Sequence, residues 1–145
     1  MISLAELLKN FAADLNLDFT EDPSGSYSYQ INDAFLIQIE MAKNEHEIVI
    51  GSFFTTLPPG KFRENVLTYT LKANYVLEEP SFFAFSIDKD ELLLYQTVEI
   101  ATLNSQKLKE HLTLFTEKAL LWKEAIDAGQ PAPADVLRKT RKLKR

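Results

Sequence analysis

A chain of 145 residues, of which 46% are hydrophobic and 26% charged, has the size and balance of one globular domain. It contains no cysteine, which excludes a disulfide framework and thiolate chemistry. The formal net charge is −5, but six of the sixteen basic residues lie at positions 138–145. The rest of the chain therefore carries ten basic and 21 acidic side chains, a net charge of −11 that argues against nucleic acid as the main ligand.

The N-terminal segment predicts a helix from about Ser3 to Leu15. Ser3 and Glu6 have the spacing of a capping box. The apolar residues that follow fall on one helical stripe: Leu4, Leu7, Leu8, Phe11 and Leu15. The early acidic residues do not suit a signal peptide, and no apolar run approaches the roughly 20 residues of a membrane span. We therefore expect a cytoplasmic protein without stable membrane insertion.

The middle of the chain alternates between two periodicities. Segments of alternating polar and apolar residues, separated by short turns, indicate antiparallel strands. Segments with helical spacing begin after Gly60 and again near Ser105. The expected strands are 27–31, 35–41, 47–53, 82–87 and 92–100, and the expected helices are 61–76 and 105–127. The order α-β-β-β-α-β-β-α predicts an α+β fold, a two-layer sandwich with an antiparallel sheet packed on helices.

The helix at 105–127 carries the clearest apolar stripe, in a 4-3-4-3-4 spacing: Leu108, Leu112, Phe115, Ala119, Trp122 and Ile126. Gly129, Pro131 and Pro133 are expected to stop it. We therefore divide the chain into a domain over residues 1–128 and a flexible basic tail over residues 129–145.

The helix at 61–76 is apolar on two opposite sides. Leu67, Leu71 and Tyr75 share one side, opposite a second apolar side. Such a helix must be covered twice, by the sheet and by a second layer. The second layer is either the same helix of a twin subunit in a homodimer or the C-terminal helix of the same chain. The residues expected at a dimer interface are Phe62, Val66, Tyr69, Ala73, Phe83 and Phe85.

The sequence offers no pattern of catalytic, metal or nucleotide chemistry. His46 lies in a polar turn beside a strand, and His111 lies on a helix next to charged residues. No phosphate-binding loop, dinucleotide motif or nucleophile elbow occurs, and there are only four glycines. We expect no enzyme, no catalytic residue, no metal site and no cofactor.

The second half of the chain resembles the class I type III secretion chaperones, the Tir-chaperone (CesT/SycE-like) family. The resemblance lies in five features: Leu71, Ala73 and Asn74 at the end of a helix, the Phe83-x-Phe85-x-Ile87 strand, an acidic turn, the Leu92-Leu93-Leu94 strand and a closing helix that ends in Trp122. It covers most of residues 1–128 and is weaker in the first half. Glu78-Glu79-Pro80 stands where the family commonly has glycine-rich residues.

This resemblance implies a homodimer that binds the N-terminal region of a secreted effector in extended form and keeps it soluble and export-competent. The family uses apolar patches on the first helix and the sheet, and adds a cargo strand to a sheet edge. The residues expected to bind cargo are Leu4, Leu7, Leu8, Phe11, Phe35, Ile37, Ile39, Ile48 and Ile50. The alternative for these positions is that they are core.

Two further interpretations stay open from the sequence. The chain could be a small regulatory or ligand-binding α+β domain with a pocket between sheet and helix. The basic residues 138–145 could simply aid solubility, or could reach an acidic partner such as a component of the export machinery.

Overall fold

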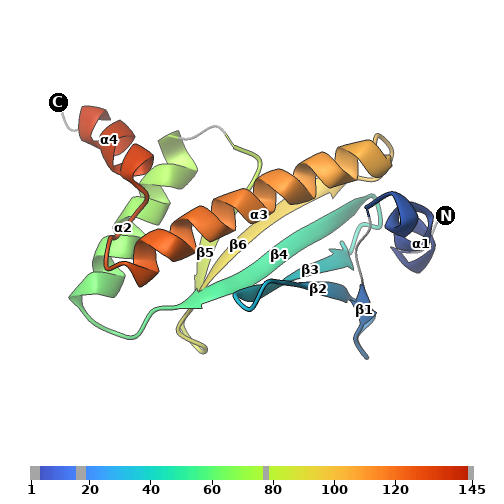
Figure 1. The fold of residues 1–145 in the computed structure, drawn as a ribbon, viewed down its shortest axis with the longest axis horizontal. Coiled ribbons are helices and arrows are strands. Elements are labelled where there is room, and N and C mark those ends of the chain that lie inside the picture. Colours follow the sequence, from blue (N-terminus) through green and yellow to red (C-terminus); the bar gives the residue numbers. More distant parts are fainter. Residues whose placement is uncertain (1–3, 16–18, 77–78, 144–145) are drawn as a thin grey trace.

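The computed structural model describes residues 4–15, 19–76 and 79–143 (Figure 1). The helices are α1 (Leu4–Leu15), α2 (Lys61–Val76), α3 (Ser105–Asp127) and α4 (Ala134–Leu143). The strands are β1 (Thr20–Glu21), β2 (Tyr27–Ile31), β3 (Phe35–Met41), β4 (Glu47–Thr56), β5 (Phe82–Ser86) and β6 (Glu91–Glu99).

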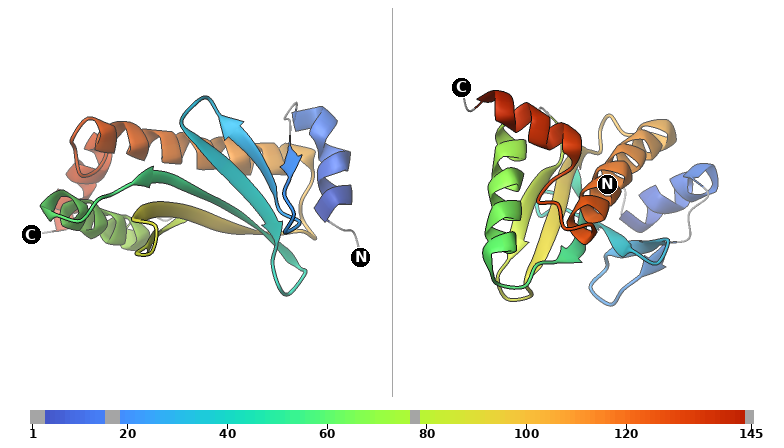
Figure 2. Two further views of the ribbon diagram at one scale, coloured as in Figure 1. Left: turned by 90° about the horizontal axis from the view of Figure 1, so that it is seen from below. Right: turned by 60° about the vertical axis from the view of Figure 1, so that its left-hand side comes forward.

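The strands form one antiparallel sheet in the order β1-β2-β3-β4-β6-β5. The long strands β4 and β6 pair at its centre, with an irregularity in register between Phe53 and Thr55. Helix α3 runs along one face of the sheet, α1 lies near the β1–β3 end and α2 beside β5 (Figures 1 and 2). The predicted α+β class and antiparallel sheet are confirmed; β1 is an additional short strand that the sequence did not reveal.

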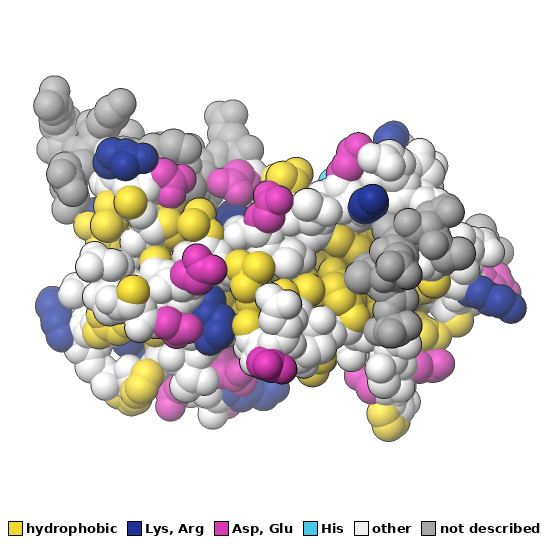
Figure 3. Space-filling view, in the orientation of Figure 1, with side chains coloured by type: hydrophobic (Ala, Val, Ile, Leu, Met, Phe, Trp, Pro, Cys, Tyr) yellow, Lys and Arg dark blue, Asp and Glu magenta, His cyan; other side chains and the backbone are white. Residues whose placement is uncertain are grey.

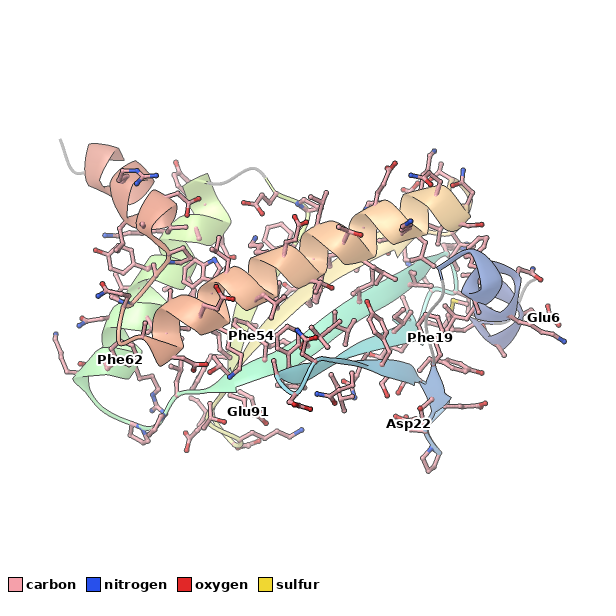
Figure 4. All side chains as sticks on the ribbon, in the orientation of Figure 1. Glu6, Phe19, Asp22, Phe54, Phe62 and Glu91 are labelled. Carbon is pink, nitrogen blue, oxygen red and sulfur yellow. The ribbon has the colours of Figure 1, made fainter. Side chains whose placement is uncertain are left out.

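The core lies between α3 and the sheet because alternate strand residues point to the same face. In β3, for example, Phe35, Ile37 and Ile39 are buried while the residues between them are exposed. All six residues of the predicted α3 stripe are buried. Phe54 lies beneath α3 at the centre of the sheet (Figure 4), and its ring is 6.1 Å from that of Phe83.

Residues 134–143 form a helix where we expected part of a flexible tail. Pro133 directly precedes the first residue of this helix, where the missing N–H of a proline costs nothing because the N–H groups at a helix start have no partner within the helix. Its carbonyl oxygen accepts a hydrogen bond from the Leu137 N–H at 3.0 Å. Ala132 and Val136 are buried, and α4 packs against α2. This packing surface, not the basic charge, explains why the chain forms a further helix after Gly129.

A side-chain clamp fixes the outer edge of β5. The Asn74 side chain donates to the Phe83 carbonyl oxygen at 3.0 Å and accepts from the Phe83 N–H at 2.8 Å. Asn74 thus replaces the hydrogen bonds that a neighbouring strand would make. It also joins α2 to β5, and Phe83 is the strand residue that contacts Trp122.

Replacing Asn74 with alanine is expected to lower the free energy of unfolding by about 1–3 kcal/mol, because one donor and one acceptor of a partly buried strand lose their partners. Urea unfolding followed by circular dichroism measures the change. Asn65→Ala is the matched control, since Asn65 lies exposed on the same helix and the change in helix propensity is the same. Equal stability of the two variants would contradict the role of the clamp.

Candidate functional site

The structure buries three of the six residues that we expect at a dimer interface. Val66, Ala73 and Phe83 are buried within one chain, because this side of α2 faces the core. Phe62, at the start of α2 (Figure 4), and the half-buried Tyr69 and Phe85 remain accessible in part. The uncovered side of α2 is the opposite one, which carries Leu71 and Tyr75.

The residues expected to bind cargo are almost all core residues. Phe11 is partly exposed and packs against the core. The others are at most 6% exposed: Leu4, Leu7, Leu8, Phe35, Ile37, Ile39, Ile48 and Ile50. The strand residues among them share the face of the sheet that the helices cover. They are therefore unavailable to a cargo chain in this fold, and the accessible apolar surface must be sought elsewhere.

A groove of about 270 Å³ opens between β2 and α3, which we call the β2–α3 groove. Figure 3 shows a hydrophobic patch in this part of the molecule. The groove is lined by Tyr29, Ile31, Lys109, Leu112, Thr113, Thr116 and Glu117. Its floor is apolar, and Lys109 and Glu117 place one charge of each sign at its border. Burial raises the pKa of Tyr29 to about 12, so this phenol stays neutral at physiological pH.

The outer edge of β2 runs beside this groove and is only half covered. β1 pairs with β2 through Thr20 opposite Ser28 and Glu21 opposite Tyr27. Within the described residues, no strand continues this pairing along Tyr29–Ile31. A free strand edge presents backbone N–H and C=O groups to any chain that lies against it. Edge and groove are contiguous, because Tyr29 and Ile31 belong to both.

The face of the sheet opposite α3 is a second accessible surface. It has a shallow depression of about 430 Å³ lined by Gln38, Glu40, Val49, Gly51, Phe53, Ala84, Leu93 and Tyr95. Phe82 on β5 and Tyr95 on β6 lie side by side at its border, with ring centroids 6.1 Å apart. Both are more than a third exposed. This mixed surface can contact another protein but has no recessed ionisable group.

The described residues contain no arrangement suited to catalysis. They hold no group of three or more His, Cys, Asp or Glu side chains that could bind a metal ion. His46 is exposed in a turn, and the His111 ring contacts the buried Gln96 amide at 3.0 Å. Among the described helices, none combines the length and apolar character that a membrane crossing requires.

A sheet with one open face, a free strand edge and an apolar groove defines a protein-binding α+β domain. Residues 6–123 match the model of the Tir chaperone protein (CesT) family. The chain therefore belongs to this family, and the sequence-based identification is confirmed. It is a non-catalytic type III secretion chaperone, a class that works by binding effector proteins.

Solved structures share this fold. A chain from the HopA1–SchA chaperone–effector complex superposes with a TM-score of 0.65 at 17% identity, covering 82% of this chain and 91% of that one. The Yersinia pestis type III secretion chaperone SycH in complex with a fragment of YscM2 gives a TM-score of 0.58 at 23% identity, covering 79% and 94%.

YbjN, described as a putative transcription regulator from E. coli, gives a TM-score of 0.62 at 15% identity, covering 84% of this chain and 90% of that one. The fold by itself therefore does not specify a chaperone, and the family match is what assigns this chain. A sequence comparison with curated proteins finds no match.

Proposed function

We propose that this chain is a cytoplasmic, homodimeric chaperone that holds the N-terminal region of a secreted effector in extended form along the β2–α3 groove. The observation that carries this proposal is the free edge of β2 beside an apolar groove. The edge supplies backbone hydrogen bonds that do not depend on cargo sequence, and the groove accepts apolar side chains. This combination suits a chain segment that is not folded.

The mechanism follows from the tendency of a free effector segment to aggregate. An unfolded effector segment exposes apolar side chains and unpaired backbone groups, and both favour aggregation. Pairing with β2 satisfies the backbone on one side, and the groove removes apolar surface from water at roughly 25 cal/mol per Å². The segment stays extended on the chaperone and therefore needs no unfolding before export. The HopA1–SchA and SycH–YscM2 structures, each a chaperone with a partner polypeptide, support the binding of a polypeptide cargo by this fold.

Affinity capture from the source organism, followed by mass spectrometry, tests the function. We expect one secreted protein, or a few, bound through residues near the N-terminus. Hydrogen exchange of the purified complex should show new protection in β2 and in the facing turns of α3. Capture of folded metabolic enzymes, or of a small molecule alone, would instead favour a ligand-binding domain.

The homodimer is part of the same proposal, and the observation that supports it is the exposed apolar side of α2. Leu71 and Tyr75 are 69% and 87% exposed, although both lie within a well-formed helix and are one turn apart. A second copy of α2 could cover them by a two-fold contact in which the same residues meet their counterparts. Leu67 lies on the same side of α2 and would extend the contact. α4 packs on α2 within the chain but leaves this surface open.

Replacing both Leu71 and Tyr75 with lysine is expected to raise the dimer dissociation constant at least about tenfold, since each change puts a charge into an apolar contact. Light scattering during size-exclusion chromatography measures the mass, and circular dichroism should stay unchanged because both positions are exposed. Ile87→Lys is the control, as Ile87 is 78% exposed in the turn after β5. A double variant that remains dimeric at low micromolar concentration would place the interface elsewhere.

A further inference from the structure

A second groove, of about 320 Å³, lies on the other flank of α3, where α4 and the segment before β5 approach it. We call it the α3–α4 groove. It is lined by Glu79, Pro80, Ser81, Gln96, Leu114, Phe115, Glu117, Lys118, Leu121, Trp122, Asp135 and Val136. Glu117 stands on the ridge of α3 that separates it from the β2–α3 groove. One wall depends on α4, which follows the part of the chain that the family model matches.

The cation at this groove is already neutralised. The Lys118 side chain is only 9% exposed, and its Nζ lies 3.4 Å from a Glu79 carboxylate oxygen. The same Nζ donates to the Ser81 carbonyl oxygen at 3.1 Å and lies 5.1 Å from the centroid of the Phe83 ring. Burial lowers the pKa of Lys118, while Glu79 opposes that shift. Lys118 therefore fastens the segment before β5 to α3 and offers no free charge to a ligand.

The other ionisable groups of the α3–α4 groove are acidic. Glu117 and Asp135 line it from two different helices. Neither forms an ion pair with a residue whose side chain the structure describes. With Lys118 and Glu79 cancelling one another, these two carboxylates leave the groove with a net negative charge. A bound group of positive charge is the electrostatic complement.

The rim of the groove carries two exposed leucines on one helical stripe. Leu114 is 61% exposed and Leu121 is 46% exposed, two helical turns apart, or about 10 Å. Glu110, Glu117 and Glu124 fall between and beside them on the same surface. Figure 3 shows hydrophobic and acidic side chains together on this side of the molecule. Apolar residues two turns apart, flanked by charges, form the seam that another helix recognises.

We propose that the α3–α4 groove docks a basic amphipathic helix of a partner protein, at a site separate from the cargo groove. Leucine-like side chains of that helix would pack against Leu114 and Leu121. Lysine or arginine residues beside them would face Glu117 and Asp135. The site allows the chaperone to hold its cargo and engage a second protein at the same time, because the two grooves lie on opposite flanks of α3.

The test uses a fluorescein-labelled peptide of about two heptads, with leucines at helix-seam spacing and lysine and glutamine elsewhere. Anisotropy should report saturable binding to the full-length protein. Leu114→Gln with Leu121→Gln should weaken that binding at least about tenfold at every salt concentration. Asp135→Asn should weaken it at low salt, with less effect at about 0.5 M salt, where exposed charges are screened.

Matched controls separate this site from general attraction to an acidic protein. Ile87→Gln with Leu36→Gln removes two other exposed apolar side chains, and Asp88→Asn removes an exposed acid in a turn. Both should leave peptide affinity unchanged, and a peptide with glutamate in place of lysine should not bind. The proposal is overturned if the glutamine pair at 114 and 121 binds like the wild type, or if the control variants lose as much affinity.

Discussion

Replacing Trp122 with alanine is expected to lower the free energy of unfolding by about 3–5 kcal/mol, because it removes the largest side chain of the core. Trp122 is 1% exposed, and its ring centroid lies 4.5 Å from that of Phe83. Phe83 in turn lies against Phe54, so the cavity would open where α3, β5 and β4 meet. Urea unfolding at fixed protein concentration measures the change, since dimerisation would add to the apparent stability.

The control is the neighbouring position on the same helix. Leu121 is 46% exposed, and Leu121→Ala should change the free energy of unfolding by no more than about 0.5 kcal/mol. Comparable losses for the two variants would mean that α3 does not dock on the sheet as described. A large loss for Trp122→Ala alone would confirm that the stripe from Leu108 to Ile126 anchors the helix.

Helix α3 was the element most fully predictable from sequence. Its buried stripe repeats at 4-3-4-3-4 spacing, and only one side of the helix can satisfy that pattern. The packing of this helix on a sheet could also be predicted, because the other segments alternate polar and apolar residues with the period of two that is typical of strands. The family resemblance rested on the same region, and the match over residues 6–123 confirms it.

The functional surfaces were less predictable because a pattern identifies a face without saying what covers it. Ile37, Ile39 and their neighbours share one face of the sheet, but the sequence leaves open whether a helix or a cargo chain lies against them. The structure buries both residues on the face of the sheet that the helices cover. The same ambiguity affected α2, which has two apolar sides. We expected the side with Val66 and Ala73 to contact a partner subunit, and in the structure both residues are buried in the core of the chain itself.

Both grooves depend on contacts between segments that are distant in sequence. Tyr29 and Thr113 line the β2–α3 groove from a strand and a helix, and neither belongs to a motif. Asp135 reaches the α3–α4 groove because α4 begins directly after Pro133, a residue that by itself indicates a stop. The sequence pattern alone does not distinguish a stop from a new helix. In the structure α4 packs against α2, and Val136 is buried while Leu137 packs against the core, although basic residues dominate this segment.

The proposed cargo site can be disrupted without unfolding the protein. Thr113 is exposed and lines the β2–α3 groove, so Thr113→Arg places a long charged side chain over an apolar floor. A cargo segment would have to displace it or bury it unpaired. We expect at least about a hundredfold loss of affinity for the captured effector segment. Calorimetric titration of that segment into the purified chaperone measures the loss.

The control makes the same chemical change outside the groove. Thr56 is exposed at the C-terminal end of β4 and lies across the sheet from Glu91. Thr56→Arg should bind the effector segment as tightly as the wild type, and both variants should show the wild-type unfolding midpoint. A photo-crosslinking residue at 113 should join the chaperone to the cargo, whereas one at 56 should not. If Thr113→Arg binds with full affinity, the cargo lies on the open face of the sheet and not between β2 and α3. The depression around Gly51 and Phe53 would then be the surface to probe.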